Sequence, residues 1–190
     1  MTKSVPEEML SMGEQRASNR RDAAAARSEL VDVMFRRHYA ALVRLAFVMV
    51  GDRGAAEDAV QDAFVALHRN LSKLRDPEAA EAYVRSAVLN RCRSWVRRKA
   101  TQRAKKPLLL VQARPSASTE ETIVARDEVG SLVTAMRTLP RRQREALACR
   151  FVLELSVAET AELLDISVGS VKTHTHRGLQ ALHQGIGVNR

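Results

Sequence analysis

The sequence predicts an all-α fold made of two small helical domains joined by a flexible linker, with a helix-turn-helix in the C-terminal domain. Apolar residues recur three, four and seven positions apart in several segments, which is the spacing of one helix face, and no strand alternation of useful length appears. Aromatic residues make up only 4% of the 190 residues, so the cores consist of aliphatic side chains that favour packed helices. Two prolines and a cluster of small polar residues between positions 105 and 118 indicate the linker.

The N-terminal half is expected to form three helices that make one domain. Helical spacing of apolar residues begins at Leu30, and Gly51 followed by Asp52 is typical of a helix end and the N-cap of the next helix. Asp76-Pro77 predicts the start of the third helix, because proline is favoured at the first helical position. We expect a mobile or weakly helical extension, a helical domain and a linker at residues 1–27, 28–100 and 101–118.

The C-terminal domain, expected over residues 119–186 with a tail at 187–190, contains the most informative segment. Ser156 and Glu159 have the spacing of a capping box, and Ser167 can cap the next helix after a tight turn, which together is the helix-turn-helix pattern. The inner face of the second helix is expected to hold Val168, Val171, Leu179 and Leu182. Its outer face is polar and basic, which suits phosphates and base edges. This face holds Ser170, Lys172, Thr173, His174, His176 and Arg177. A generic helical hairpin with a solvated face is the alternative interpretation.

The charges of the chain are segregated along the sequence. The net charge is +9, and the segment from Arg85 to Lys106 holds nine basic residues and no acidic one. Trp95 lies inside this segment and Tyr83 lies close to it, and a mixture of basic and aromatic side chains is typical of proteins that bind single strands. Acidic residues are concentrated at 55–62 and 116–128. A charge run is often only a solvated surface, but this segregation indicates two different partner surfaces.

Several classes of protein are disfavoured. Cys92 and Cys149 form no CxxC pair, and no apolar run approaches the roughly 18 residues of a membrane span, so we expect a cytoplasmic protein with no membrane segment of its own. His174 and His176 are two positions apart and point to nearly opposite sides of a helix, so they do not share a metal ion. No nucleophile motif or phosphate-binding glycine loop appears. We therefore expect no enzymatic activity, metal or cofactor.

Three segments carry a resemblance to a known family. AAEDAVQDAFVAL at 55–67 resembles the acidic amphipathic helix of the extracytoplasmic-function (group IV) sigma factors of bacterial RNA polymerase. AYVRSAVLNRCRSWVRRK at 82–99 is similar to the promoter-opening helix of that family. Residues 139–182 are similar to its C-terminal domain, including the LP-x-x-x-RE opening and the VK-x-x-x-x-R recognition helix. The resemblance covers roughly 30–183 and implies an alternative sigma factor with a region 2 type domain and a region 4 type domain.

The resemblance also implies a role for each group of residues. Contacts with the clamp coiled-coil of core RNA polymerase are implied for Glu57, Asp58, Gln61 and Asp62. Recognition and melting of the minus-ten element are implied for Ser72, Lys73, Tyr83, Arg85, Asn90, Arg91, Arg93, Arg97 and Arg98. Binding of the minus-thirty-five element is implied for Arg141, Arg142, Arg144, Ser167, Ser170, Lys172, Thr173, His174, His176 and Arg177. The C-terminal domain would also contact the polymerase flap, and an anti-sigma factor is a common partner in the family.

Two other functions remain as alternatives. A stand-alone helix-turn-helix regulator would carry a receiver domain built on a parallel sheet, and residues 1–100 hold no strand pattern. An enzyme acting on nucleic acid would need a carboxylate or metal constellation, for which only Glu57, Asp58 and Asp62 are clustered. His174 stands where many relatives carry Arg, and a neutral imidazole does not make the bidentate guanine contact of an arginine, so we predict no promoter sequence.

Overall fold

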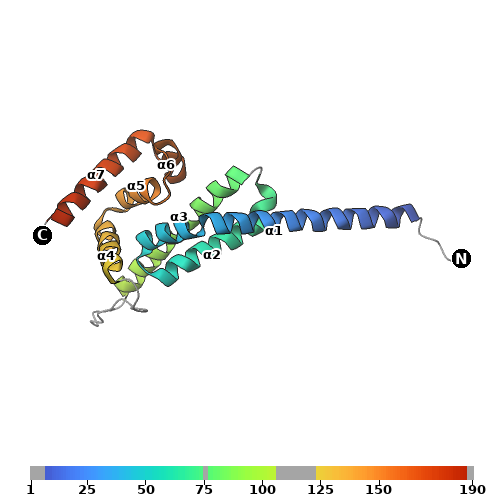
Figure 1. The fold of residues 1–190 in the computed structure, drawn as a ribbon, viewed down its shortest axis with the longest axis horizontal. Coiled ribbons are helices and arrows are strands. Elements are labelled where there is room, and N and C mark those ends of the chain that lie inside the picture. Colours follow the sequence, from blue (N-terminus) through green and yellow to red (C-terminus); the bar gives the residue numbers. More distant parts are fainter. Residues whose placement is uncertain (1–6, 75–76, 106–122, 188–190) are drawn as a thin grey trace.

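The computed structural model describes residues 7–74, 77–105 and 123–187. Within these ranges the chain forms seven α-helices and one short 3-10 helix, with no strand (Figure 1). The elements are α1 (Glu7–Val50), α2 (Arg53–Asn70), η1 (Leu71–Lys73), α3 (Pro77–Lys105), α4 (Ile123–Thr138), α5 (Arg141–Phe151), α6 (Val157–Leu164) and α7 (Val168–Gly187). The predicted all-α class is confirmed. The expected linker lies largely outside the described residues, although residues 101–105 form the end of α3.

Helices α1, α2 and α3 pack against one another around an aliphatic core. Leu45, Val60, Leu67 and Val84 are completely buried there. The predicted break after α1 is confirmed, because Gly51 has a φ of 69°, a backbone conformation that glycine adopts at little cost. Asp52 then caps α2 by accepting a hydrogen bond from the backbone N–H of Ala55 at 2.8 Å.

Helix α1 is longer than the sequence analysis predicted. It begins at Glu7, so most of the segment expected to be a mobile or weakly helical extension belongs to one continuous helix with the rest of α1. Figure 1 shows the N-terminal part of α1 running well beyond the other helices. The absence of proline from residues 7–50 and the run of four alanines at 23–26 favour this continuity, because alanine has the highest helix propensity.

Helices α5, α6 and α7 form the second packed unit. Ser156 Oγ accepts from the backbone N–H of Glu159 at 3.1 Å, and the Glu159 carboxylate accepts from the N–H of Ser156 at 2.7 Å, so the predicted capping box is confirmed. Asp165 forms the turn with a φ of 52°. Ser167 Oγ then accepts from the N–H of Ser170 at 3.1 Å at the start of α7. These caps set the geometry of the predicted helix-turn-helix.

The inner face of α7 differs from the prediction. Val168 and Leu179 were expected to be buried, but each is 46% exposed. Val171 is completely buried as expected. Gly178 provides the close approach to α5, because a Cβ at this position would lie 2.8 Å from Leu147 Cδ1. The contact between these helices therefore depends on a glycine that the apolar pattern does not reveal.

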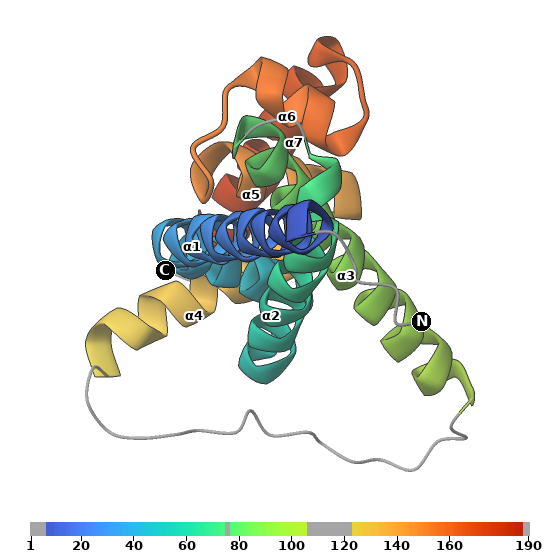
Figure 2. The ribbon, with the colours of Figure 1, turned by 90° about the vertical axis from the view of Figure 1, so that its right-hand side faces the viewer.

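The two helical units lie against each other. Helix α1 contacts α4 and α5, and α3 contacts α6. Figures 1 and 2 both show α5, α6 and α7 gathered on one side of the bundle that α1, α2 and α3 form. Several of the candidate functional side chains lie at this contact.

Candidate nucleic-acid and partner interfaces

The basic helix α3 presents only part of its predicted cationic surface to solvent. Asn90, Arg97 and Arg98 are exposed, and Lys73 is exposed in the neighbouring η1. Arg85 is half-buried and bonds to Glu81 on the same helix. The solvent-exposed part of this cationic surface therefore lies mainly in the C-terminal half of α3.

Arg91, another candidate on the minus-ten list, has an acidic partner on a neighbouring helix. Its Nε lies 3.8 Å from a carboxylate oxygen of Asp62 on α2. Ser72 lies in η1, and its side chain is outside the described part of the structure. Its neighbour Lys73 donates to Asn70 Oδ1 at 3.3 Å, a bond that spans η1 from its N-cap residue to its last residue.

The two candidate aromatic side chains are both half-buried. The Tyr83 ring packs against the core, and its hydroxyl accepts a hydrogen bond from Asn70 Nδ2 at 3.1 Å. Trp95 also packs against the core, but Lys99 Nζ lies over its ring, 4.3 Å from the centroid. Trp95 also lines a surface cavity, and Tyr83 is not among the residues that line it.

The acidic candidates on α2 form one exposed face. Asp58, Gln61 and Asp62 are exposed, whereas Glu57 is half-buried and accepts from Arg53 Nε at 2.9 Å. Asp58 and Asp62 are one helical turn apart, so their carboxylates share a face. We call Asp58, Gln61 and Asp62 the acidic face of α2.

A cavity of about 510 Å³ connects the acidic face of α2 with the basic helix α3. Asp58 and Asp62 line it from α2, and Asn90, Arg91 and Arg98 are among the residues that line it from α3. The two candidate surfaces, which the sequence separates by about thirty residues, are therefore neighbours in the fold.

The outer face of α7 has the character that the sequence analysis predicted. Lys172, Thr173, His176 and Arg177 are exposed, and His174 is half-buried. Thr173 Oγ1 donates to the backbone carbonyl of Gly169 at 2.9 Å. In the part of the chain that the structure describes, no cluster of His, Cys, Asp and Glu is arranged to hold a metal ion.

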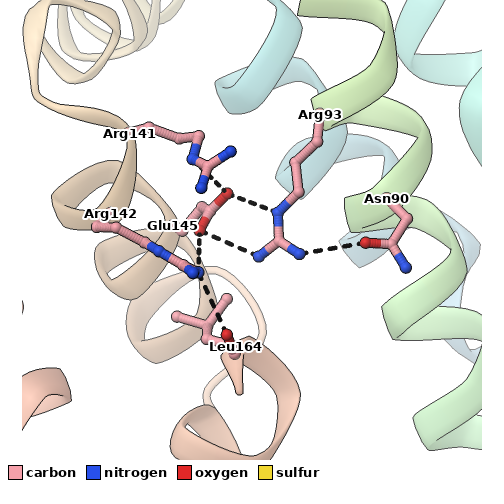
Figure 3. A network of polar contacts seen from close by, with 6 residues as sticks. All are labelled: Asn90, Arg93, Arg141, Arg142, Glu145 and Leu164. Carbon is pink, nitrogen blue, oxygen red and sulfur yellow. Dashed lines mark hydrogen bonds and ion pairs between the residues drawn. The ribbon is translucent and has the colours of Figure 1, made fainter. Parts of the chain in front are cut away.

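A buried carboxylate gathers several of the candidate arginines at the contact between the two units (Figure 3). Glu145 on α5 is completely buried and accepts two hydrogen bonds from Arg93 on α3, at 2.8 and 3.1 Å. Arg142 Nη1 donates to the same carboxylate at 3.0 Å and to the carbonyl of Leu164 at 3.2 Å. Arg141 Nε lies 3.6 Å from it. The two hydrogen bonds between Arg93 and Glu145 raise the pKa of the Arg93 guanidinium and join α3 of the first unit to α5 of the second.

Sequence reasoning missed Glu145 as a site residue. Arg93 and Arg142 were expected to contact DNA, but in this arrangement both are engaged by Glu145, and Arg93 also donates to Asn90 Oδ1 at 3.2 Å. Two signals could have found Glu145: it is the glutamate of the LP-x-x-x-RE opening, and it is the only acidic residue in the segment 139–153. Its main partner lies 52 residues earlier in the chain, which no local pattern reveals.

Glu145→Gln is expected to lower the free energy of unfolding by about 1–3 kcal/mol, the cost of leaving buried hydrogen-bond donors without their partner. The substitution keeps the volume but leaves Arg93 and Arg142 without their counter-charge at a partly buried contact. Urea unfolding followed by circular dichroism measures the change. Glu162→Gln, which alters an exposed carboxylate on α6, is the matched control, and an equal effect of both variants would contradict the structural role of Glu145.

Comparison with known proteins decides the family. Residues 34–102 match the family model described as Sigma-70 region 2, and residues 130–182 match Sigma-70, region 4. The ECF RNA polymerase sigma factor SigM of Mycobacterium tuberculosis is 29% identical over 162 residues, which cover 82% of this chain and 76% of that protein. The RNA polymerase sigma-E factor of Streptomyces avermitilis is 28% identical over 144 residues, covering 76% of this chain and 78% of the relative.

This chain belongs to the extracytoplasmic-function family of RNA polymerase sigma factors. The region 2 match begins at residue 34 within α1 and covers α2 and most of α3. The region 4 match extends from α4 into α7. A stand-alone helix-turn-helix regulator is not favoured, because the first half of this sigma factor matches region 2.

Solved structures share the fold of this sigma factor. CnrH, solved in complex with the cytosolic domain of CnrY, superposes with a TM-score of 0.67 at 22% identity, over 89% of this chain and 95% of CnrH. The sigma factor RpoE, solved with the anti-sigma factor NepR from Bartonella quintana, gives a TM-score of 0.62 at 18% identity, over 83% and 98% of the two chains. Within the described residues of this sigma factor, no helix combines the length and apolar character needed to cross a membrane.

Proposed function

We propose that this sigma factor binds core RNA polymerase through the acidic face of α2, and promoter DNA through α3 and α7. The observation that carries the proposal is the exposed acidic face in a protein of net charge +9. An acidic surface repels DNA, so its partner is a basic protein surface, such as the clamp coiled-coil that the family resemblance implies. Glu57, which forms an ion pair with Arg53, adds a further carboxylate beside this face.

At the minus-ten element, the exposed part of α3 is the surface that meets DNA. Arg97 and Arg98 contact phosphates, Asn90 reaches base edges, and Lys73 contributes from η1. Opening the duplex costs a few kcal/mol per unstacked step, and stacking a base on an aromatic ring returns about 1–3 kcal/mol. Trp95 takes this stacking role in our proposal, while Tyr83 positions η1 through Asn70.

At the minus-thirty-five element, α7 lies in the major groove with its outer face against the bases and phosphates. Lys172 and Arg177 contact phosphates, and Thr173 and His176 lie toward the base edges. His174, Ser167 and Ser170 flank this surface.

The arginines of α5 belong to the same domain as α7. Arg141 is exposed and reaches the DNA backbone. Arg93 on α3 becomes available for DNA when the contact between the two units opens, because its partner Glu145 lies in the other unit. Arg144 lines the cavity at this contact, so opening also exposes it, whereas Arg142 reaches DNA only by leaving Glu145 and Leu164 of its own unit.

The domain boundaries enter the proposal with one change. A region 2 type domain over 28–100 and a region 4 type domain over 119–186 are retained, whereas residues 7–27 are assigned to α1. We further propose that this factor acts in the cytoplasm and performs no catalysis of its own. It contacts the polymerase flap with its second domain, and an anti-sigma factor is among its partners, as in the solved complex of RpoE with NepR.

Co-elution with purified bacterial core polymerase tests the first half of this proposal. The expected result is a stable one-to-one complex on gel filtration. That complex is expected to bind a forked promoter fragment with a single-stranded minus-ten segment more tightly than the fully paired fragment. Separate elution of the protein and the core enzyme would refute binding to polymerase, and equal affinity for both fragments would refute the melting role.

A further inference from the structure

A second cavity lies where the two helical units meet. Its volume is about 260 Å³, and it is lined by residues of α1, α3 and α5. Four of its lining residues are arginines: Arg93 and Arg97 from α3, and Arg141 and Arg144 from α5. Both units therefore contribute guanidinium groups to one partly open cavity, whose lining also includes Met49, Val96 and Ala100.

The arginines of this cavity outnumber the acidic groups available to them. Among the described residues, Glu145 is the only carboxylate that forms an ion pair with any of the four, and it is already bonded to Arg93 and Arg142. Arg97 makes no ion pair with a side chain that the structure describes. Positive charge therefore remains uncompensated across the contact between the units.

Arg144 is the clearest sign of this imbalance. Its Nε is buried and has no hydrogen-bond partner among the described residues. Burial, followed by the nearby charge of Arg137, lowers the pKa of the Arg144 guanidinium. Buried polar groups are normally hydrogen-bonded, so an unpaired arginine nitrogen at a basic cavity indicates an anion that would complete the site.

The chemistry and size of the cavity favour phosphate groups. The planar guanidinium fork matches phosphate oxygens, and several such forks suit an anion that carries several charges on neighbouring oxygens. The volume lies below the roughly 300–1,000 Å³ of pockets that enclose drug-sized ligands, so it suits a compact anion rather than a peptide segment. The hydroxyl of Ser94 adds one further polar group to the lining.

We propose that this cavity binds a diphosphate or triphosphate group, and that the bound anion holds the two units of the sigma factor together. The group comes from a free inorganic polyphosphate or from a nucleotide whose nucleoside lies outside the cavity. Because Arg93, Arg97 and Arg141 are also assigned to DNA, the bound anion competes with promoter binding. This competition rests on the proposed function, whereas the binding of the anion does not.

Isothermal titration calorimetry of the full-length protein with sodium triphosphate, in buffer of physiological salt concentration, tests the site directly. The expected result is saturation at one anion per chain. Arg97→Ala combined with Arg144→Ala is expected to weaken binding at least tenfold. Arg36→Ala combined with Arg37→Ala removes the same charge from exposed positions of α1 and is expected to change the affinity less than twofold.

The outcomes separate the proposal from general charge attraction. Absence of saturable binding, or equal weakening in the two double variants, would overturn it. Arg97→Ala alone alters an exposed side chain and keeps the test valid if the double variant is unstable, because it is also expected to weaken binding. If ATP binds as tightly as triphosphate, a nucleotide can supply the phosphate group. If triphosphate binds and ATP does not, the ligand is the inorganic anion. Both results support the site, and binding of adenosine with equal affinity would overturn it.

Energy transfer between two dyes tests whether the anion holds the units together. Burial raises the pKa of the Cys92 and Cys149 thiols to about 12, so dyes react selectively with cysteines introduced by Glu78→Cys on α3 and Gln180→Cys on α7. Triphosphate is expected to raise the transfer efficiency in this protein and to leave it unchanged when Arg97→Ala and Arg144→Ala are added. Unchanged transfer at saturating triphosphate would overturn the clamping role. Polymerase is absent from both experiments, so their failure is distinguishable from failure of the proposed sigma activity.

Discussion

Lys172→Ala combined with Arg177→Ala is expected to weaken binding of the holoenzyme to its promoter on the order of 100-fold, or about 2.7 kcal/mol. Both side chains are exposed on the outer face of α7, where the proposed function places the DNA backbone. Each phosphate contact releases counterions, so each lost contact lowers the slope of log affinity against log salt by about one unit. The double variant should therefore show a slope that is flatter by about two units.

The measurement is a salt titration of promoter affinity for the wild type and the variant. Arg36→Ala with Arg37→Ala again removes two exposed positive charges, but from α1, and its slope should equal that of the wild type within error. A double variant on α7 that keeps the wild-type affinity and slope would show that this face does not contact DNA.

Asp58→Arg combined with Gln61→Ala is expected to weaken binding to core polymerase on the order of 100-fold while leaving the fold intact. Asp58 and Gln61 are both exposed on the acidic face of α2, so the substitution disturbs no buried contact. Placing a positive charge against a basic partner costs several kcal/mol, in addition to the attraction that is lost. Fluorescence anisotropy with labelled protein and a titration of core enzyme measures the affinity.

The matched control for this variant makes the same change of charge outside the acidic face of α2. Glu29→Arg with Gln180→Ala replaces an exposed carboxylate on α1 and an exposed amide on α7. Its affinity for core is expected to stay within a factor of two of the wild type. Equal weakening in both variants would mean that net charge, rather than the acidic face of α2, governs the interaction.

The helix boundaries that the sequence predicted well are those that depend on local chemistry. Gly51 and Asp52 end α1 and cap α2 through contacts within four residues, and the capping box of Ser156 and Glu159 spans three. Such capping interactions join residues within three or four positions, so a short segment of sequence is enough to predict them. For the same reason, Pro140 marks the break between α4 and α5.

The features that the sequence analysis missed depend on distant contacts. Glu145 acts through Arg93, which lies on another helix and in the other packed unit. Gly178 matters because Leu147 approaches it, which the apolar pattern of α7 does not encode. The charge run on α3 correctly indicated a basic helix, but only packing decides which of its arginines are exposed and which are engaged.

Reconstituted transcription tests the central claim most directly. Purified protein and bacterial core polymerase are combined on a genomic template library, and the five-prime ends of the transcripts are sequenced. Our account predicts defined start sites that disappear when the protein is omitted and share sequence elements near minus ten and minus thirty-five. Start sites that are the same with and without the protein, although the protein is folded and the core enzyme is active, would contradict it.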